Sequence, residues 1–143
     1  MILRWFGLSL LVCGLFAAAG CGGPPGMEQV SGKVTYEDGS FPAGEIATIR
    51  FEPIAGTQAP DQSKGASGDI KPDGTYSLST IEKGDGAYVG EYKVCFTILK
   101  SYIGRESLVD PQFAAAMSTP LTAKVTSAGP NKFDFTIKKA AGR

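Results

Sequence analysis

The stretch Gly90–Leu99 reads GEYKVCFTIL and carries the clearest strand signal in the chain. One of its two faces is apolar throughout: Tyr92, Val94, Phe96 and Ile98. The opposite face is mixed, with Lys93 and Thr97 beside Cys95 and Leu99. A strand that is apolar on one face and partly apolar on the other is typical of the interior of a sheet. The stretch therefore predicts a β-sheet protein with this strand at a central position.

Six other segments show the same period-two alternation and are separated by turn-forming residues. In chain order they are Val30–Tyr36, Ile46–Glu52, Ser67–Lys71, Thr75–Thr80, Leu121–Val125 and Phe133–Ile137. The strongest hairpin signal is Lys71-Pro72-Asp73-Gly74, because proline presets φ and glycine accepts a positive φ. Seven short strands with evenly spaced turns predict a seven-stranded antiparallel β-sandwich.

Segment Ser101–Ser118 interrupts this rhythm between the fifth and sixth strands. Within it, Asp110–Met117 predicts a short helix, with Asp110 as N-cap, Pro111 in the first turn and alanines after it. Phe113 and Met117 lie one turn apart on such a helix. Because a single apolar stripe is normally buried, we expect both side chains to plug the open end of the sandwich.

The N-terminus has the three parts of a secretory signal. Arg4 is the only charge before an apolar run of about 14 residues, whereas a membrane-spanning helix needs roughly 20. The run ends in Ala18-Ala19-Gly20-Cys21, which resembles the bacterial lipobox. That resemblance implies that residues 1–20 are a signal peptide, cleaved before Cys21, and that the Cys21 thiol carries the lipid. The alternative is an ordinary signal peptide followed by an incidental cysteine.

Cleavage before Cys21 would leave 123 of the 143 residues, which is enough for one domain. We expect a Gly/Pro tether over residues 21–29, the sandwich over residues 30–139 and a frayed tail over residues 140–143. The lipid at Cys21 would then make the membrane the first partner of the chain. Since Cys13 would leave with the signal peptide, Cys95 would have no partner for an internal disulfide.

Composition excludes several classes of function. Lys and Arg together number 14, against 14 Asp and Glu, and no basic run is present, so nucleic acid is not an expected partner. The chain contains no histidine, which is the commonest general base and metal ligand in proteins. We therefore expect no catalytic residues and no cofactor or metal.

Three segments together resemble carboxypeptidase-regulatory-like domains, which belong to the transthyretin-like (prealbumin-like) sandwiches. They are Val30–Tyr36 (VSGKVTY), Asp69–Leu78 (DIKPDGTYSL) and Gly90–Val94 (GEYKV). The resemblance extends from Val30 to about Lys138 and is greatest to small bacterial lipoproteins with one such domain. It implies a binding or structural module of the cell surface or periplasm. The enzymatic transthyretin-like proteins, hydrolases of 5-hydroxyisourate, depend on histidines that this chain lacks.

A few residues invite a more specific reading. Tyr88, Tyr102 and Phe113 lie in or beside loops and could stack on a sugar or a peptide; we retain Tyr102 and Phe113 as candidate binding residues. Cys95 lies in mid-strand, where a thiol usually behaves as a small hydrophobe rather than a nucleophile. The aspartates Asp69, Asp73 and Asp85 could bind calcium, but Asp-Gly pairs are also what turns require.

If successive strands alternate in direction, the loops divide between the two ends of the sandwich. Loops 54–66, 81–89 and 127–131 would share the tethered end near the membrane. The turns at Asp38-Gly39 and Asp73-Gly74 and the segment Ser101–Ser118 would lie at the free end, and we expect this segment to be the outward-facing contact region. The sequence thus predicts a non-catalytic envelope lipoprotein with a binding or structural role. A module with a specific carbohydrate or peptide site, and so a glycan or envelope-protein partner, is the alternative.

Overall fold

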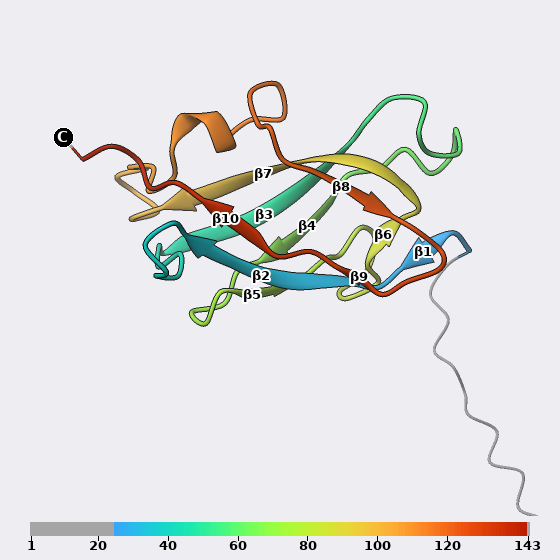
Figure 1. The fold of residues 1–143 in the computed structure, drawn as a ribbon, viewed down its shortest axis with the longest axis horizontal. Coiled ribbons are helices and arrows are strands. Elements are labelled where there is room, and N and C mark those ends of the chain that lie inside the picture. The colour runs from blue at the N-terminus through green and yellow to red at the C-terminus, as the bar shows by residue number, and fades with distance from the viewer. Residues whose placement is uncertain (1–24, 143) are drawn as a thin grey trace, which may run out of the picture.

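A computed structural model describes residues 25–142, and the predicted signal peptide and Cys21 lie outside this range. The described chain is all-β (Figure 1). It contains one 3-10 turn, Pro111–Phe113, and no helix long and apolar enough to cross a membrane. Its strands are β1 (Met27–Glu28), β2 (Val30–Tyr36), β3 (Ile46–Pro53), β4 (Ala66–Asp69), β5 (Thr75–Ser77), β6 (Ala87–Tyr88), β7 (Gly90–Leu99), β8 (Thr122–Val125), β9 (Asn131–Lys132) and β10 (Phe135–Ile137).

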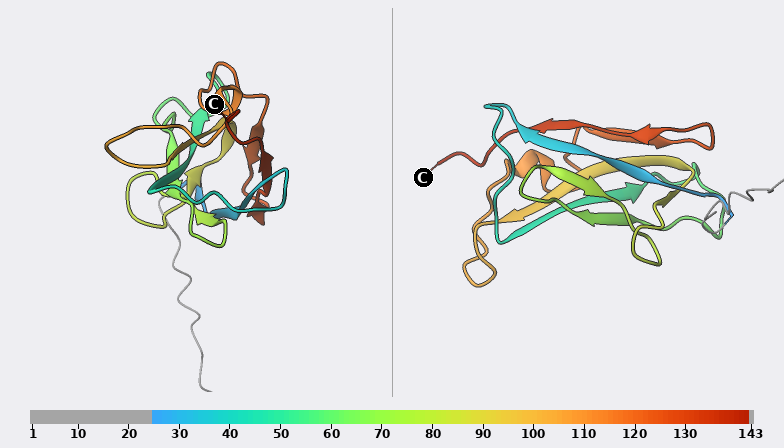
Figure 2. Two further views of the ribbon diagram at one scale, coloured as in Figure 1. Left: turned by 90° about the vertical axis from the view of Figure 1, so that its left-hand side faces the viewer. Right: turned by 90° about the horizontal axis from the view of Figure 1, so that it is seen from below.

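Two four-stranded sheets form the layers of the molecule (Figure 2). One has the order β4-β3-β7-β8, and the other has β10-β2-β5 with β9 also paired to β2. β7 lies between β3 and β8. It pairs with the whole length of β3, from Ile46 opposite Leu99 to Pro53 opposite Tyr92. The predicted central position of Gly90–Leu99 is therefore confirmed.

The core lies between the two sheets and is built from the alternating faces that the sequence predicts. On β7, all four residues of the apolar face are at most 1% exposed. Phe135 of the β10 sheet lies 6.2 Å from Phe51 and 6.1 Å from Phe96 of the opposite sheet, both edge-on. Such aromatic pairs contribute about 0.5–1.5 kcal/mol each beyond simple burial. Phe135 thus joins the two layers.

The pairing differs in part from the predicted antiparallel sandwich of seven strands. β10 and β9 run parallel to β2, while the other neighbouring strands pair antiparallel. The parallel pair follows from the alternation itself, because the first and seventh principal strands run in the same direction and lie side by side. The additional strands are β1 and β6, two residues each, and a division of the last strand between β9 and β10.

The hairpin at Lys71–Gly74 forms its turn but not a two-stranded ribbon. Lys71 N donates to Thr75 O at 2.9 Å, and Gly74 has a φ of +84°. However, β4 pairs with β3 and β5 pairs with β2, so the two arms belong to different sheets, and beyond the turn they are linked by a single isolated bridge between Ser67 and Ser79. The turn therefore carries the chain from one layer to the other.

The helix predicted over Asp110–Met117 is not present. Asp110 does cap the turn, since its Oδ1 accepts a hydrogen bond from Gln112 N at 2.9 Å, but only Pro111–Phe113 are helical, in a 3-10 turn. Phe113 is buried in the core as expected, whereas Met117 is fully exposed. A single 3-10 turn cannot place a residue four positions later on the same buried face, so the prediction for Met117 was wrong.

Both ends of the domain extend further than predicted. Met27 and Glu28, assigned to the tether, pair as β1 with β6, and Met27 is buried. Lys139 bridges to Val109, and Ala140 N donates to Leu108 O at 3.1 Å, so the predicted tail begins as docked chain. The tether between Cys21 and Met27 could then reach at most about 20 Å.

The elongated sandwich has two distinct ends (Figure 1). The N-terminal end carries β1, β6, loop 54–65 and the turn 126–131. The far end carries the turn 37–40, the crossover 40–45, the hairpin tip 100–106 and the C-terminal segment 139–142. This distribution matches the predicted alternation of loops, and β7 alone separates the two ends by about 30 Å.

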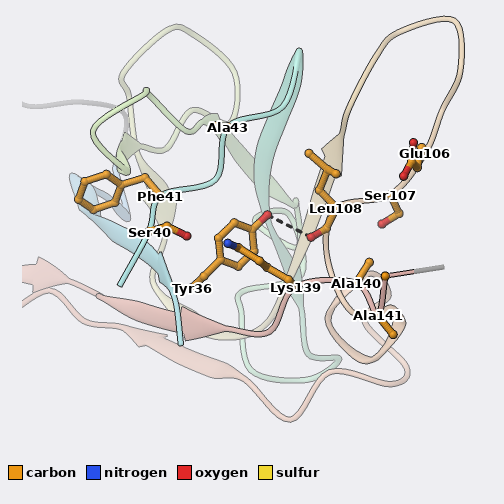
Figure 3. A pocket seen from close by; sticks show the side chains of 11 residues that line it. Tyr36, Ser40, Phe41, Ala43, Glu106, Ser107, Leu108, Lys139, Ala140 and Ala141 are labelled. Atoms are coloured by element: carbon orange, nitrogen blue, oxygen red, sulfur yellow. Dashed lines mark hydrogen bonds between the residues drawn. The ribbon is translucent and has the colours of Figure 1, made fainter. Parts of the chain in front are cut away.

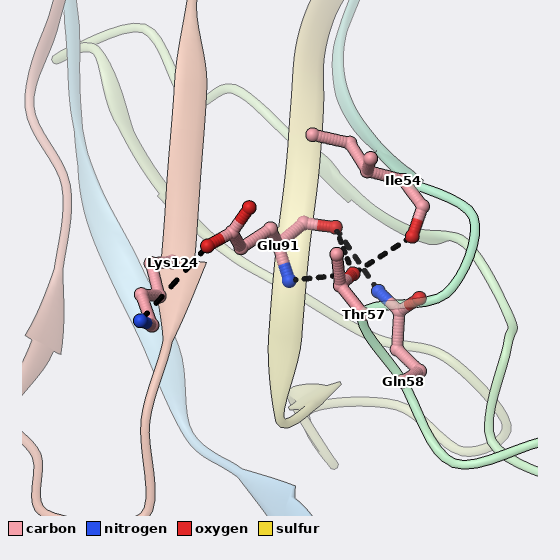
Figure 4. Close-up of polar contacts among 5 residues, drawn as sticks. All are labelled: Ile54, Thr57, Gln58, Glu91 and Lys124. Carbon is pink, nitrogen blue, oxygen red and sulfur yellow. Dashed lines mark hydrogen bonds and ion pairs between the residues drawn. The ribbon is translucent and has the colours of Figure 1, made fainter.

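Loop 54–65 is fixed to the start of β7 (Figure 4). Thr57 Oγ1 donates to Ile54 O at 2.7 Å and accepts from Glu91 N at 3.1 Å, while Gln58 Nε2 donates to Glu91 O at 3.1 Å. Glu91 also pairs with Lys124 of β8 at 3.9 Å, a contact between exposed groups that adds little stability. The loop thus supplies hydrogen-bond partners for the Glu91 N–H and C=O at the start of β7.

Candidate functional site at the far end

A hollow of about 940 Å³ opens at the far end, where three segments distant in sequence meet (Figure 3). Its walls are the crossover residues Ser40, Phe41 and Ala43, the stretch 106–108 and the C-terminal segment 139–142, and Tyr36 lies at its base. We call this space the far-end hollow. Ligand pockets in proteins commonly have volumes of roughly 300–1,000 Å³, so its size suits a small ligand or a short segment of chain.

Tyr36 closes the base of the hollow because it is the last inward-facing residue of β2. Its side chain is buried, and its hydroxyl donates to Leu108 O at 3.1 Å (Figure 3). Burial raises the pKa of Tyr36, and the nearby Asp38 carboxylate raises it further. The phenol is therefore a neutral hydrogen-bond donor, and its bond to Leu108 O links the end of β2 to the wall formed by residues 106–108.

An ion pair lies across this base. Lys139 Nζ is 2.6 Å from Asp38 Oδ2 and 5.1 Å from the centre of the Tyr36 ring. Asp38 also accepts from the backbone N and the hydroxyl of Ser40, at 2.9 and 2.5 Å. The hydrogen bond from Lys139, followed by those from Ser40, holds the pKa of Asp38 far below its usual range. These contacts fasten the C-terminal segment to the turn after β2.

The polar side chains around the hollow are mostly engaged with one another. Ser40 donates to Asp38, and Ser107 Oγ donates to Val109 O at 3.1 Å. Glu106 pairs with Lys100 at 3.5 Å. Nucleophilic catalysis requires a hydroxyl or thiol beside an unpaired general base. Among the described residues that line the hollow, no such pair occurs.

The predicted binding residues occupy different positions. Tyr102 is 72% exposed at the tip of a hairpin, beside Ile103 at 94%, and its backbone N donates to Glu45 Oε2 at 2.8 Å. The base of the same hairpin, residues 106–108, forms one wall of the far-end hollow. Phe113 is 6% exposed in the core, and Tyr88 is buried too, so neither presents its ring to a ligand.

The segment Ser101–Ser118 therefore has two parts. Residues 101–106 project from the far end, whereas Val109 and Phe113 pack into the core. Thr119, just beyond, donates from its hydroxyl to Val94 O at 2.7 Å. The whole segment cannot be replaced by a short turn, because Val109 and Phe113 belong to the core.

Cys95 lies on the outer face of β7 and is fully buried. It is directly opposite Arg50 of β3. Burial raises the pKa of the Cys95 thiol, although the Arg50 guanidinium opposes this effect. A buried, protonated thiol is a poor nucleophile, so the geometry agrees with a packing role.

The three aspartates considered for calcium do not come together. The Asp85 carboxylate accepts from the backbone N of Thr80, Ile81 and Glu82 at 2.7–2.9 Å, and Asp73 accepts from the N and hydroxyl of Thr75. Burial acts to raise the pKa of Asp85, but these backbone hydrogen bonds outweigh it and the pKa is lowered. Asp73 and Asp85 thus each complete a turn of their own, and no group of three or more His, Cys, Asp or Glu side chains that could hold a metal occurs among residues 25–142.

Comparisons with protein-family models, with curated proteins and with solved structures give no match for this chain.

Most of the far-end hollow escapes sequence analysis. Apart from Tyr36, its lining residues come from a turn, a hairpin base and the segment 139–142, and none of these belongs to a recognisable motif. One signal was available: Tyr36 ends an inward-facing strand, and a buried tyrosine hydroxyl needs a partner beyond the strand. That requirement indicates that another segment must cover the end of β2, without saying which one.

Proposed function

We propose that the chain is a non-catalytic lipoprotein of the cell envelope, attached to a membrane through lipid on Cys21, which presents the far-end hollow to a partner. The observation that supports this proposal is the position of the hollow. It lies at the end of the sandwich opposite β1, and β1 begins six residues after Cys21. A short tether at one end would leave the other end free to contact the envelope.

The proposed fold is a transthyretin-like sandwich of the carboxypeptidase-regulatory-like type. Two facing four-stranded sheets are consistent with this architecture, and the motifs at β2, the Lys71–Gly74 turn and β7 support it. Such a sandwich hosts unrelated functions, so the role proposed here depends on the hollow and the anchor rather than on the fold.

The anchor is tested by the variant Cys21→Ser, expressed as the full chain in a bacterial host with lipoprotein processing. A serine hydroxyl is a far weaker nucleophile than a thiolate, so we expect no acylation and a shift of most of the protein from the membrane fraction to the soluble fraction. Cys13→Ser is the matched control and should remain with the membrane. Retention of Cys21→Ser in the membrane fraction, at the mass of the wild type, would refute the lipid anchor.

A further inference from the structure

We infer that the far-end hollow binds an uncharged, extended peptide segment, which pairs with the main chain of the crossover at Phe41 and Ala43. This inference rests on the proposed function and specifies the ligand of the same site. Both residues border the hollow, while Pro42 between them is buried and does not.

Free main-chain groups are the first reason. Within the described chain, no hydrogen bond engages the N–H or C=O of Phe41 or of Ala43. Proline fixes its own φ near −65° and disfavours the helical region for the residue before it, so Pro42 favours an extended backbone at Phe41. An exposed edge of this kind is a template for an added strand.

The engaged side chains are the second reason, and they argue against a sugar. A sugar would need an open aromatic face and free polar side chains. The Tyr36 ring is buried beneath the Lys139 ammonium, and the Phe41 ring has the Lys33 ammonium 4.6 Å from its centre. The hydroxyls of Ser40 and Ser107 are already bonded. Among the described residues, the groups that remain for recognition are unpaired main-chain groups, which include those of Phe41 and Ala43.

Charge is the third reason. The cation and the anion that border the hollow are both paired, Lys139 with Asp38 and Glu106 with Lys100. One cation and one anion leave no net charge at the hollow to attract a charged ligand, and a neutral segment leaves both pairs intact. The apolar wall residues Leu108, Ala140 and Ala141 provide contacts for alternate side chains of such a peptide.

The test begins with selection. The purified full chain, held in detergent, is used to select binders from a phage-displayed library of random 12-residue peptides and is applied in parallel to a glycan array. We expect enriched peptides with few charges and alternating apolar residues. Titration calorimetry then measures a synthetic enriched peptide against the wild type and the variants Ala43→Pro, Ala43→Ser and Ala141→Trp.

Ala43→Pro removes one unpaired N–H and should weaken binding about tenfold, because a buried peptide carbonyl loses its donor. Ala43→Ser keeps the N–H and should bind within about twofold of the wild type. Ala141→Trp fills the hollow from an exposed position and should abolish binding. N-methylation of the peptide at alternate residues should abolish binding in one register and leave the other nearly unchanged, which is the signature of strand pairing.

Three results would overturn the inference. One is equal binding of the peptide to the wild type, Ala43→Pro and Ala141→Trp. Another is a glycan that binds the wild type but not Ala141→Trp, in which case the hollow is a binding site, as the proposed function holds, for a different ligand. The third is the absence of any enriched peptide or glycan, which would also remove the binding role from the proposed function while leaving the anchor at Cys21 untouched.

Discussion

Phe51→Ala should lower the free energy of unfolding by about 3–5 kcal/mol, a large part of the stability of a domain of this size. Phe51 is fully buried on β3 and lies against three aromatic rings: Tyr92 at 5.6 Å, Phe133 at 6.0 Å and Phe135 at 6.2 Å. Truncation removes the contacts that join the two sheets and leaves a cavity that rigid strands cannot close.

Urea denaturation followed by circular dichroism measures the effect. Tyr102→Ala is the matched control, since it removes an aromatic ring that is 72% exposed and should change the unfolding free energy by less than about 0.5 kcal/mol. Equal midpoints for Phe51→Ala and Tyr102→Ala would contradict the assignment of the core.

Gly32→Ala should destabilise the protein by about 3 kcal/mol or more, although it adds only one methyl group. A Cβ at Gly32 would lie 1.8 Å from Phe133 O and 2.9 Å from the Tyr76 hydroxyl, which donates to that same carbonyl at 2.6 Å. The methyl would therefore push the last strand away from β2 and break a buried hydrogen bond. The nearest atoms belong to the Phe133 main chain, which cannot move aside as a flexible side chain would.

Gly39→Ala separates this steric effect from the general cost of replacing glycine. Gly39 has a φ of +82° but nothing within 4 Å of its added Cβ, so we expect a loss of roughly 1–2 kcal/mol from backbone strain alone. Thermal unfolding of both variants under identical conditions gives the comparison. A Gly32→Ala protein as stable as Gly39→Ala would show that β2 and the last strand do not approach as closely as described.

The sequence predicted the faces of the strands well, because burial on one side of a sheet imposes a period of two that single residues reveal. Val34, Phe51, Tyr76 and Phe96 are all buried where the alternation places them. The sequence predicted less well which strands pair with one another. The arms around Lys71–Gly74 separate into different sheets, since pairing depends on contacts with distant strands rather than on the turn between them.

Very short strands, and a site built from several segments distant in sequence, were harder to predict. Met27 and Glu28 form a strand only because Ala87 and Tyr88 are there to pair with them, and two residues carry no periodicity. The same holds for Ala140, which is predicted as tail but is docked because its N–H donates to Leu108 O of a distant segment. The far-end hollow arises from such long-range contacts, so local patterns could indicate its end of the molecule but not its lining.

The central claim is that the domain stands on a membrane with the far-end hollow facing outward. Quenching of a protein-attached fluorophore by lipids whose headgroups carry a quencher tests it most directly. The lipidated protein is reconstituted in vesicles with a fluorophore on Ala128→Cys, in the turn at the N-terminal end, or on Ile103→Cys, at the far-end hairpin tip; Cys95 is buried and should not react. We predict strong quenching at position 128 and little at position 103. Equal quenching at both positions, or stronger quenching at position 103, would contradict the account.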